Sequence, residues 1–160
     1  MTNPLLTDWT TPYGLPPFDQ IADDDFAPAV DAVLTEARAE IMAVADNPEL
    51  ATFDNTILAL ELSERGLGRV LGTFYGIAGA DSNAAREGLQ RDFAPLLSAF
   101  GSEVTENKAL FARIDDLWTR CETLGLTDEQ TRVLMLSRRG FVRQGAMLEG
   151  AAAERLRDVK

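Results

Sequence analysis

The chain has 160 residues, of which 46% are hydrophobic, so it can bury a core and is too apolar to be disordered throughout. Its 26 acidic and 15 basic residues give a net charge of −11, which argues against nucleic acid and an anionic membrane surface as partners. The chain contains no histidine and a single cysteine, Cys121. An intrachain disulfide, a cysteine–histidine pair and a histidine-ligated zinc site are therefore excluded.

The first segment, DWTTPYGLPPFDQI at residues 8–21, carries three prolines and three aromatic residues before any helical pattern begins. The prolines stand at positions 12, 16 and 17, so they do not supply the PxxP spacing of a docking peptide. A disordered leader seldom holds three aromatic residues so close together. We therefore predict an extended N-terminal strap over residues 1–22, held to the helices by Trp9, Tyr13 and Phe18.

Helical spacing of apolar residues begins at Phe26, and the sequence predicts an all-α bundle of about five to six helices over residues 23–160. The first helix is preceded by Asp23–Asp25 as cap and dipole partners, and it is ended by Pro48. Its predicted buried face consists of Phe26, Val30, Val33, Ala37, Ile41 and Val44.

The second predicted helix begins near residues 53–55 and runs to about Gly79, with glycines at positions 66, 68, 72, 76 and 79. Each interior glycine costs about 1 kcal/mol relative to alanine. Gly68, Gly72 and Gly76 lie four apart, on one side of a helix. Either another helix backbone approaches this side closely, or the helix breaks near Gly66. The spacing does not match a dinucleotide-binding loop, because Leu71 stands where that motif needs glycine.

Three more helices follow. The third, after the turn at residues 81–83, contains Pro95, where a kink is expected. Asn107 is expected to cap the fourth helix, and Thr127 with Gln130 forms a capping box for the fifth. The predicted buried residues of the fifth helix are Val133, Leu136, Phe141 and Val142.

The last stretch, residues 148–160, has high helix propensity but no C-cap signal. Leu156 and Val159 have no apolar partner downstream in the sequence. We expect this helical domain, residues 23–160, to be truncated at its C-terminus.

Few residues suggest a catalytic, metal-binding or ligand-binding role. Two carboxylate pairs, Glu36 with Glu40 and Glu61 with Glu64, have metal-ligand spacing, yet the Glu-x-x-His pattern of di-metal bundles cannot occur without histidine. Exposed helix carboxylates are the simpler interpretation. Trp9, Tyr13, Tyr75 and Trp118 could stack on a ligand, but aromatic residues in apolar stripes are usually core, as is a lone cysteine such as Cys121. The residues alone predict a soluble acidic domain with no catalytic or metal-binding residue of its own, and they identify no substrate-binding residue.

Several segments resemble a known family. TPYGLPPFDQI, FAPAVDAVLTEARAEI, NPELATFDNTILALE, NKALFARIDDLWTR and FVRQGA occur in the order found in the N-terminal part of the thimet-oligopeptidase family of zinc metallopeptidases. FDNTILALE and LFARIDDLW resemble its dipeptidyl carboxypeptidase branch. The glycine-rich stretch departs from the family, where larger apolar residues are expected.

The resemblance implies that this chain is an N-terminal fragment of a peptidyl-dipeptidase about four times longer. In the family, zinc is bound by an HExxH helix and a downstream glutamate, beyond the part matched here, so no cofactor is expected in this chain. The implied partners are the remainder of the peptidase chain and short peptide substrates, which pass through a channel walled partly by these helices. A cytoplasmic location is expected. The alternative is a stand-alone acidic helical module that binds a partner protein.

Overall fold

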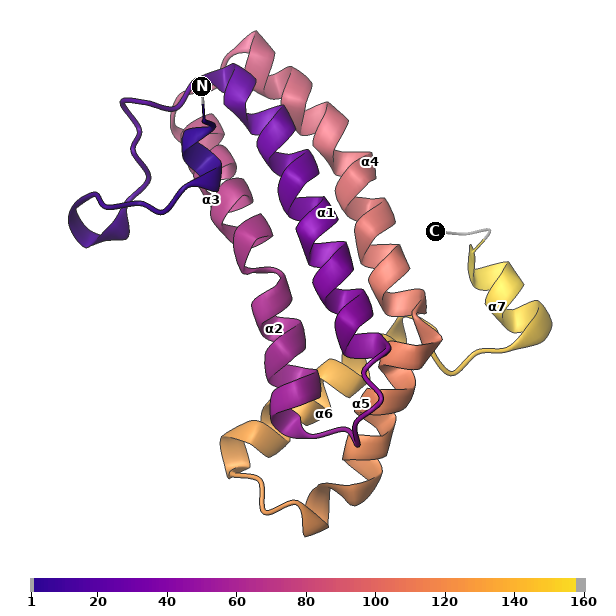
Figure 1. Ribbon diagram of the computed structural model, residues 1–160. Coiled ribbons are helices and arrows are strands. Elements are labelled where there is room, and N and C mark those ends of the chain that lie inside the picture. Colours follow the sequence, from indigo (N-terminus) through magenta and orange to yellow (C-terminus); the bar gives the residue numbers. More distant parts are fainter. Residues whose placement is uncertain (1, 158–160) are drawn as a thin grey trace. The chain divides into compact units, whose positions relative to one another are not determined.

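The computed structural model describes residues 2–157, and this part of the chain is helical with no strand, which confirms the predicted all-α bundle (Figure 1). The α-helices are α1 (Phe26–Ala45), α2 (Ala59–Ser63), α3 (Arg65–Ala80), α4 (Ala84–Glu106), α5 (Lys108–Arg120), α6 (Asp128–Arg143) and α7 (Gly150–Arg157). Short 3-10 turns occur at Pro4–Leu6, Pro12–Gly14, Asp23–Asp25 and Cys121–Thr123. Within residues 2–157, no helix is long and apolar enough to cross a membrane.

The predicted helix starts are confirmed by their hydrogen bonds. The Asn107 side chain accepts a bond of 3.0 Å from the backbone N–H of Leu110 and so caps α5. In the box that begins α6, the Gln130 N–H donates to Thr127 Oγ1 at 3.2 Å, and the Thr127 N–H donates to Gln130 Oε1 at 3.0 Å. These bonds satisfy backbone groups that have no partner within the helix itself.

The predicted second helix is interrupted. Its first six residues, Phe53–Leu58, form a π-helical turn, which leads into α2. Glu64 then separates α2 from α3, with φ −98° and ψ 6° instead of helical angles. The predicted break near Gly66 is therefore present, two residues upstream of that glycine. Pro95 lies inside α4, which continues through it.

Two compact units can be distinguished within the chain. Unit 1 comprises residues 2–39 and Ser63–Ser98, and unit 2 comprises Glu40–Leu62 and residues 99–157. The predicted division into a strap (1–22) and a helical domain (23–160) remains a prediction.

The core of unit 1 is aromatic. Phe74 of α3 lies between Phe26 of α1 and Phe93 of α4, with edge-to-face ring contacts at centroid distances of 5.0 Å on both sides. All three side chains are buried, as are Val30 and Val70. Edge-to-face aromatic contacts stabilise a core beyond the area that they bury, so these three rings fix the positions of the helices within unit 1.

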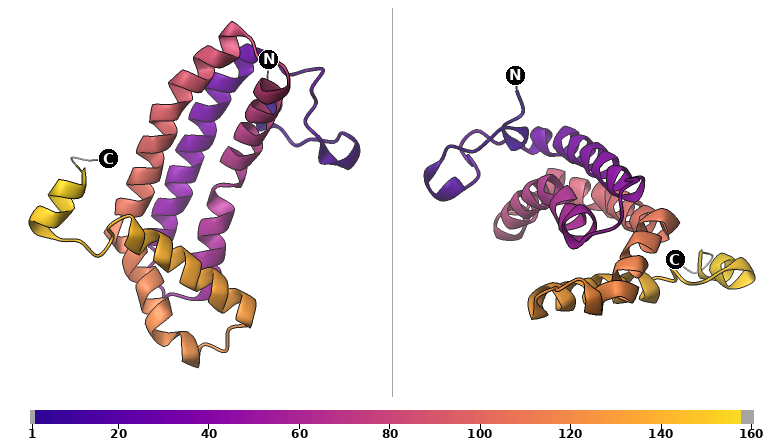
Figure 2. Two further views of the ribbon diagram at one scale, coloured as in Figure 1. Left: turned by 180° about the vertical axis from the view of Figure 1, so that it is seen from behind. Right: turned by 60° about the horizontal axis from the view of Figure 1, so that its bottom comes forward.

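The core of unit 2 is centred on α5. Leu110, Ile114 and Leu117 are fully buried, and Phe111 stacks on Phe141 of α6 at 6.1 Å. Figure 2 shows α6 beside α5 in both views. The buried face of α6 differs from the prediction, because Leu134 is fully buried whereas Leu136 is exposed.

The last described helix has a partner within unit 2. The Leu156 side chain is half-buried and lies so close to Gly145 that a Cβ atom there would be 2.3 Å from Leu156 Cδ2. The partner of Leu156 thus lies upstream in the chain, whereas the expectation concerned only partners downstream. Val159 is outside the described residues.

Candidate functional site

The N-terminal strap is attached to α3 through Leu5 and Trp9. The Leu5 side chain is fully buried, and its carbonyl accepts a hydrogen bond of 3.0 Å from Arg69 Nη2. The same guanidinium lies over the Trp9 ring, 4.8 Å from the centroid, and Trp9 Nε1 donates to the Pro4 carbonyl at 3.0 Å. Arg69 thus joins two parts of the strap to one helix by a hydrogen bond and a cation–π contact.

The remainder of the strap is largely exposed. Tyr13 is 98% exposed and Phe18 is 56% exposed, so of the three aromatic residues predicted to hold the strap only Trp9 does so. Tyr13 also has a positive φ of 62°, which non-glycine residues rarely adopt, and it forms a turn with Gly14. The turn carries the phenol ring away from the core of unit 1.

A groove of about 540 Å³ lies between the strap and α3. Trp9, Pro16 and Phe18 line it from the strap, and Arg69, Gly72 and Gly76 line it from the helix. We refer to it as the α3 groove. Arg69 is the charged residue among those that line it, so the groove offers apolar surface and a guanidinium at its wall. Such a composition suits binding, since pockets that bind ligands are mostly apolar with a few polar groups.

The glycine row of α3 is on the open side of the helix. A Cβ atom built on Gly68, Gly72 or Gly76 would meet no atom within 4 Å among the described residues. The predicted close approach of another helix backbone is therefore not made by this part of the chain. Gly66 differs, because a Cβ there would lie 3.4 Å from Val33 Cγ1, which is an ordinary contact.

The other residues considered from the sequence do not come together as a site. Glu36, Glu40, Glu61 and Glu64 are exposed, and no group of three carboxylate or thiol side chains in residues 2–157 could hold a metal ion. Tyr75 packs edge-to-face on Phe74 at 5.1 Å, and Trp118 lies below the guanidinium of Arg138 at 5.8 Å. Cys121 is half-buried.

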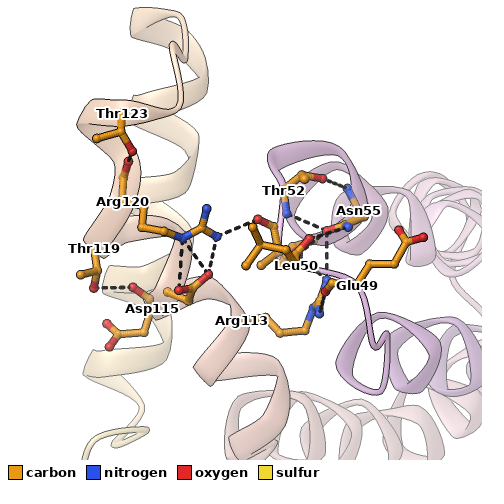
Figure 3. Close-up of polar contacts among 12 residues, drawn as sticks. Glu49, Leu50, Thr52, Asn55, Arg113, Asp115, Thr119, Arg120 and Thr123 are labelled. Atoms are coloured by element: carbon orange, nitrogen blue, oxygen red, sulfur yellow. Dashed lines mark hydrogen bonds and ion pairs between the residues drawn. The ribbon is translucent and has the colours of Figure 1, made fainter.

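A second polar cluster, in unit 2, is built around Arg113 of α5 (Figure 3). Arg113 Nη1 donates to the carbonyls of Asn47 at 2.7 Å and Glu49 at 2.9 Å. Its Nη2 donates to Asn55 Oδ1 at 3.0 Å and to the buried Thr56 Oγ1 at 3.2 Å. A single guanidinium therefore holds both the loop after α1 and the π-helical turn, which is a structural role.

Arg120, about two helical turns further along α5, makes a similar set of contacts. Its Nη2 donates to the Ala51 carbonyl at 2.8 Å and pairs with Asp116 (Figure 3). The hydrogen bond from Arg120 lowers the pKa of the Asp116 carboxyl, more than burial raises it. This cluster fixes the loop at Ala51 to α5.

Arg69 was not identified as a functional residue from the sequence. The available signal was its position: it is the sole charged residue between Gly66 and Ala80. A charge inside an otherwise apolar, glycine-rich helix requires a partner, and here the partners come from a strap about sixty residues earlier.

Comparison with curated proteins places this all-helical chain in a family of bacterial peptidases, over the N-terminal part of those proteins. It is 40% identical to dipeptidyl carboxypeptidase of Escherichia coli K12 over 155 residues, which is 97% of this chain and 23% of the relative. Dipeptidyl carboxypeptidase of Salmonella typhimurium LT2 is 38% identical over 156 residues, again 23% of that protein. Oligopeptidase A of Escherichia coli K12 is 28% identical over 117 residues. No family model matches the chain.

These figures support the resemblance found in the sequence. They also show that the chain spans less than a quarter of the length of the curated relatives that it matches.

Proposed function

We propose that this chain is the N-terminal helical domain of a zinc peptidyl-dipeptidase, an enzyme that releases dipeptides from the C-termini of short peptides. In that role the domain forms part of the wall of the peptide channel and is catalytically inactive by itself. The observation that carries the proposal is the 40% identity to a dipeptidyl carboxypeptidase over 97% of the chain.

The residues of this chain do not fit a zinc site. The sequence contains no histidine, and no three potential ligands gather among the described residues. Catalytic zinc is generally held by three protein ligands, with histidine prominent among them. In the proposed enzyme the metal and its ligands therefore belong to the remaining polypeptide, and this domain contributes packing and channel surface.

The proposal is tested by a chimera in which this chain replaces the matched segment of Escherichia coli dipeptidyl carboxypeptidase. We expect the chimera to release dipeptides from a short N-terminally blocked peptide at a rate comparable to that of the parent enzyme. The same enzyme with the segment deleted serves as the control and should be inactive. A chimera that is folded, by circular dichroism and gel filtration, but inactive would contradict the proposal.

The isolated chain provides a second test. Incubated with zinc and the same peptide, it should release no dipeptide, and zinc-dependent release by this histidine-free chain would exclude the proposed role.

A stand-alone module that binds a partner protein is the second candidate. It is favoured by exposed apolar side chains such as Leu50, 69% exposed, and Met42, 58% exposed. The natural coding sequence distinguishes the two candidate functions. An HExxH motif encoded downstream of Lys160 supports the peptidase domain, and a stop codon directly after Lys160 supports the stand-alone module.

A further inference from the structure

The exposed glycine row on α3 has no structural reason within the described chain. Gly68, Gly72 and Gly76 have room for a larger side chain, since a Cβ at each would meet nothing within 4 Å. Their φ angles are ordinary helical ones, so the backbone does not require glycine either. Alanine would make a more stable helix at each position. The glycine row is therefore suited to contact a polypeptide segment that lies outside residues 2–157.

The α3 groove, which can accept another segment, lies beside this glycine row. Gly72 and Gly76 lie on the helix side of the α3 groove, whose volume is about 540 Å³. The opposite side is Trp9, Pro16 and Phe18 of the strap, and Trp9 is held in place by Arg69. The groove is thus apolar, open along α3, and bounded by a wall whose tryptophan is fixed by contacts within unit 1.

Exposed apolar groups extend the surface beyond the groove. Phe18, which lines the groove, is 56% exposed, and Leu15, three residues earlier on the strap, is 53% exposed. Contiguous apolar surface of this kind on a soluble domain generally marks an interaction site. The glycines add a specific feature, because a helix without side chains allows a second backbone to approach closely.

We propose that the α3 groove receives a helix from the remaining part of the peptidase chain, packed across Gly72 and Gly76 and against Trp9 and Phe18. This inference rests on the proposed function. It commits to the parent chain because the relatives are more than four times as long as the segment matched, the match being 23% of their length. The docked helix presents small or apolar residues to the groove, with a carbonyl or polar side chain near Arg69.

The test is thiol labelling at the glycine row. Gly72→Cys is introduced into the isolated chain and into the chimera described above, with Cys121→Ala in both, and the label is located by mass spectrometry. In the isolated chain the thiol should react rapidly, since the position is open. In the chimera the labelling rate of this thiol should be lower by a factor of about ten or more, because the reagent reaches it only when the helix undocks.

Gly101→Cys in α4 is the matched control, since a Cβ there also meets nothing within 4 Å and the residue does not line the groove. Greater protection at Gly72 than at Gly101 in the peptide-free chimera supports the proposal. Equal rates at the two positions overturn it.

Other occupants give different results. Protection that appears only on adding peptide identifies the substrate as the occupant, and protection that rises with concentration of the isolated chain identifies a second copy. Either result overturns the proposal. If the chimera is active but its Gly72→Cys thiol is unprotected, the docking proposal is wrong and the proposed function stands. If the chimera is folded but inactive, the proposed function is wrong.

Discussion

The Arg113 side chain connects several segments of unit 2 (Figure 3). Its guanidinium reaches two backbone carbonyls and two side chains, in segments 57 to 66 residues earlier in the chain. Arginine suits this role because its five N–H donors are fixed in one plane, whereas lysine has a single point of charge.

Replacing Arg113 by methionine is expected to lower the free energy of unfolding by about 2–3 kcal/mol, because bonds to a charged donor are lost and Thr56 stays buried. Arg113→Lys should recover part of this loss. Urea denaturation followed by circular dichroism measures the difference. Arg139→Met, at an exposed position of α6, is the control and should change stability by less than about 0.5 kcal/mol. Equal effects at the two positions would show that the Arg113 contacts do not contribute.

Asp23 makes unit 1 sensitive to acid. Hydrogen bonds from Asn83 and then from Arg86, at 3.0 Å and 2.7 Å, hold the pKa of this carboxyl below its ordinary value. A carboxyl whose pKa is lower in the folded state stabilises the fold above its unfolded pKa, near 3.9, and this contribution is lost as pH falls through the folded pKa.

We therefore expect Asp23→Asn to be less stable than the wild type at pH 7, with the difference shrinking as the pH falls below about 4. Urea midpoints measured across this range give the result. The control Asp24→Asn removes the same charge from an exposed neighbour without the Asn83 and Arg86 bonds. A difference for Asp23→Asn that is independent of pH would rule out this linkage.

Glycines have opposite roles in different elements of the chain. In α3, Gly68, Gly72 and Gly76 have ordinary helical backbone angles and room for a Cβ atom, whereas Gly125, after α5, has a φ of 62° in the left-handed region. Alanine in that region costs about 1–2 kcal/mol.

The expected result is that Gly76→Ala stabilises the isolated chain by about 0.5–1 kcal/mol, while Gly125→Ala destabilises it by about 1–2 kcal/mol. Both variants add the same methyl group to open space, so backbone conformation is the difference between them. Thermal unfolding of the two variants beside the wild type measures the signs. A destabilising Gly76→Ala would mean that the groove side of α3 is occupied within the isolated chain.

The helix boundaries agree with the capping residues and the proline near each of them in the sequence. The caps at Asn107 and Thr127 and the end of α1 before Pro48 were predicted from residues within a few positions of each boundary. The break at Glu64 was one of two predicted explanations for the glycine-rich stretch. Which side of α6 is buried was predicted less well. Val133, Leu134 and Leu136 all lie within one helical turn, and the choice among them depends on the neighbouring helix.

The charge of the whole chain is a property that no single contact explains. With a net charge of −11, the folded state carries self-repulsion that salt should reduce. We expect the thermal midpoint to rise between about 0.01 M and about 0.1 M sodium chloride, as the Debye length falls from about 30 Å to about 10 Å. Potassium chloride should give the same shift. A midpoint that falls with both salts would indicate that attractive ion pairs such as Arg86–Asp23 outweigh the repulsion.

The all-α class, most helix ends and the resemblance to a peptidase family could be predicted from the sequence, because periodicity, capping residues and collinear motifs are local properties of the chain. Helix packing, in contrast, sets which strap residues are buried, joins Trp9 and Leu5 to α3 through Arg69, and places the glycine row beside a groove. It also brought Arg113 to a loop more than fifty residues away. These features depend on partners distant in the chain, whose meeting is set by the packing of whole helices and leaves no local pattern in the sequence.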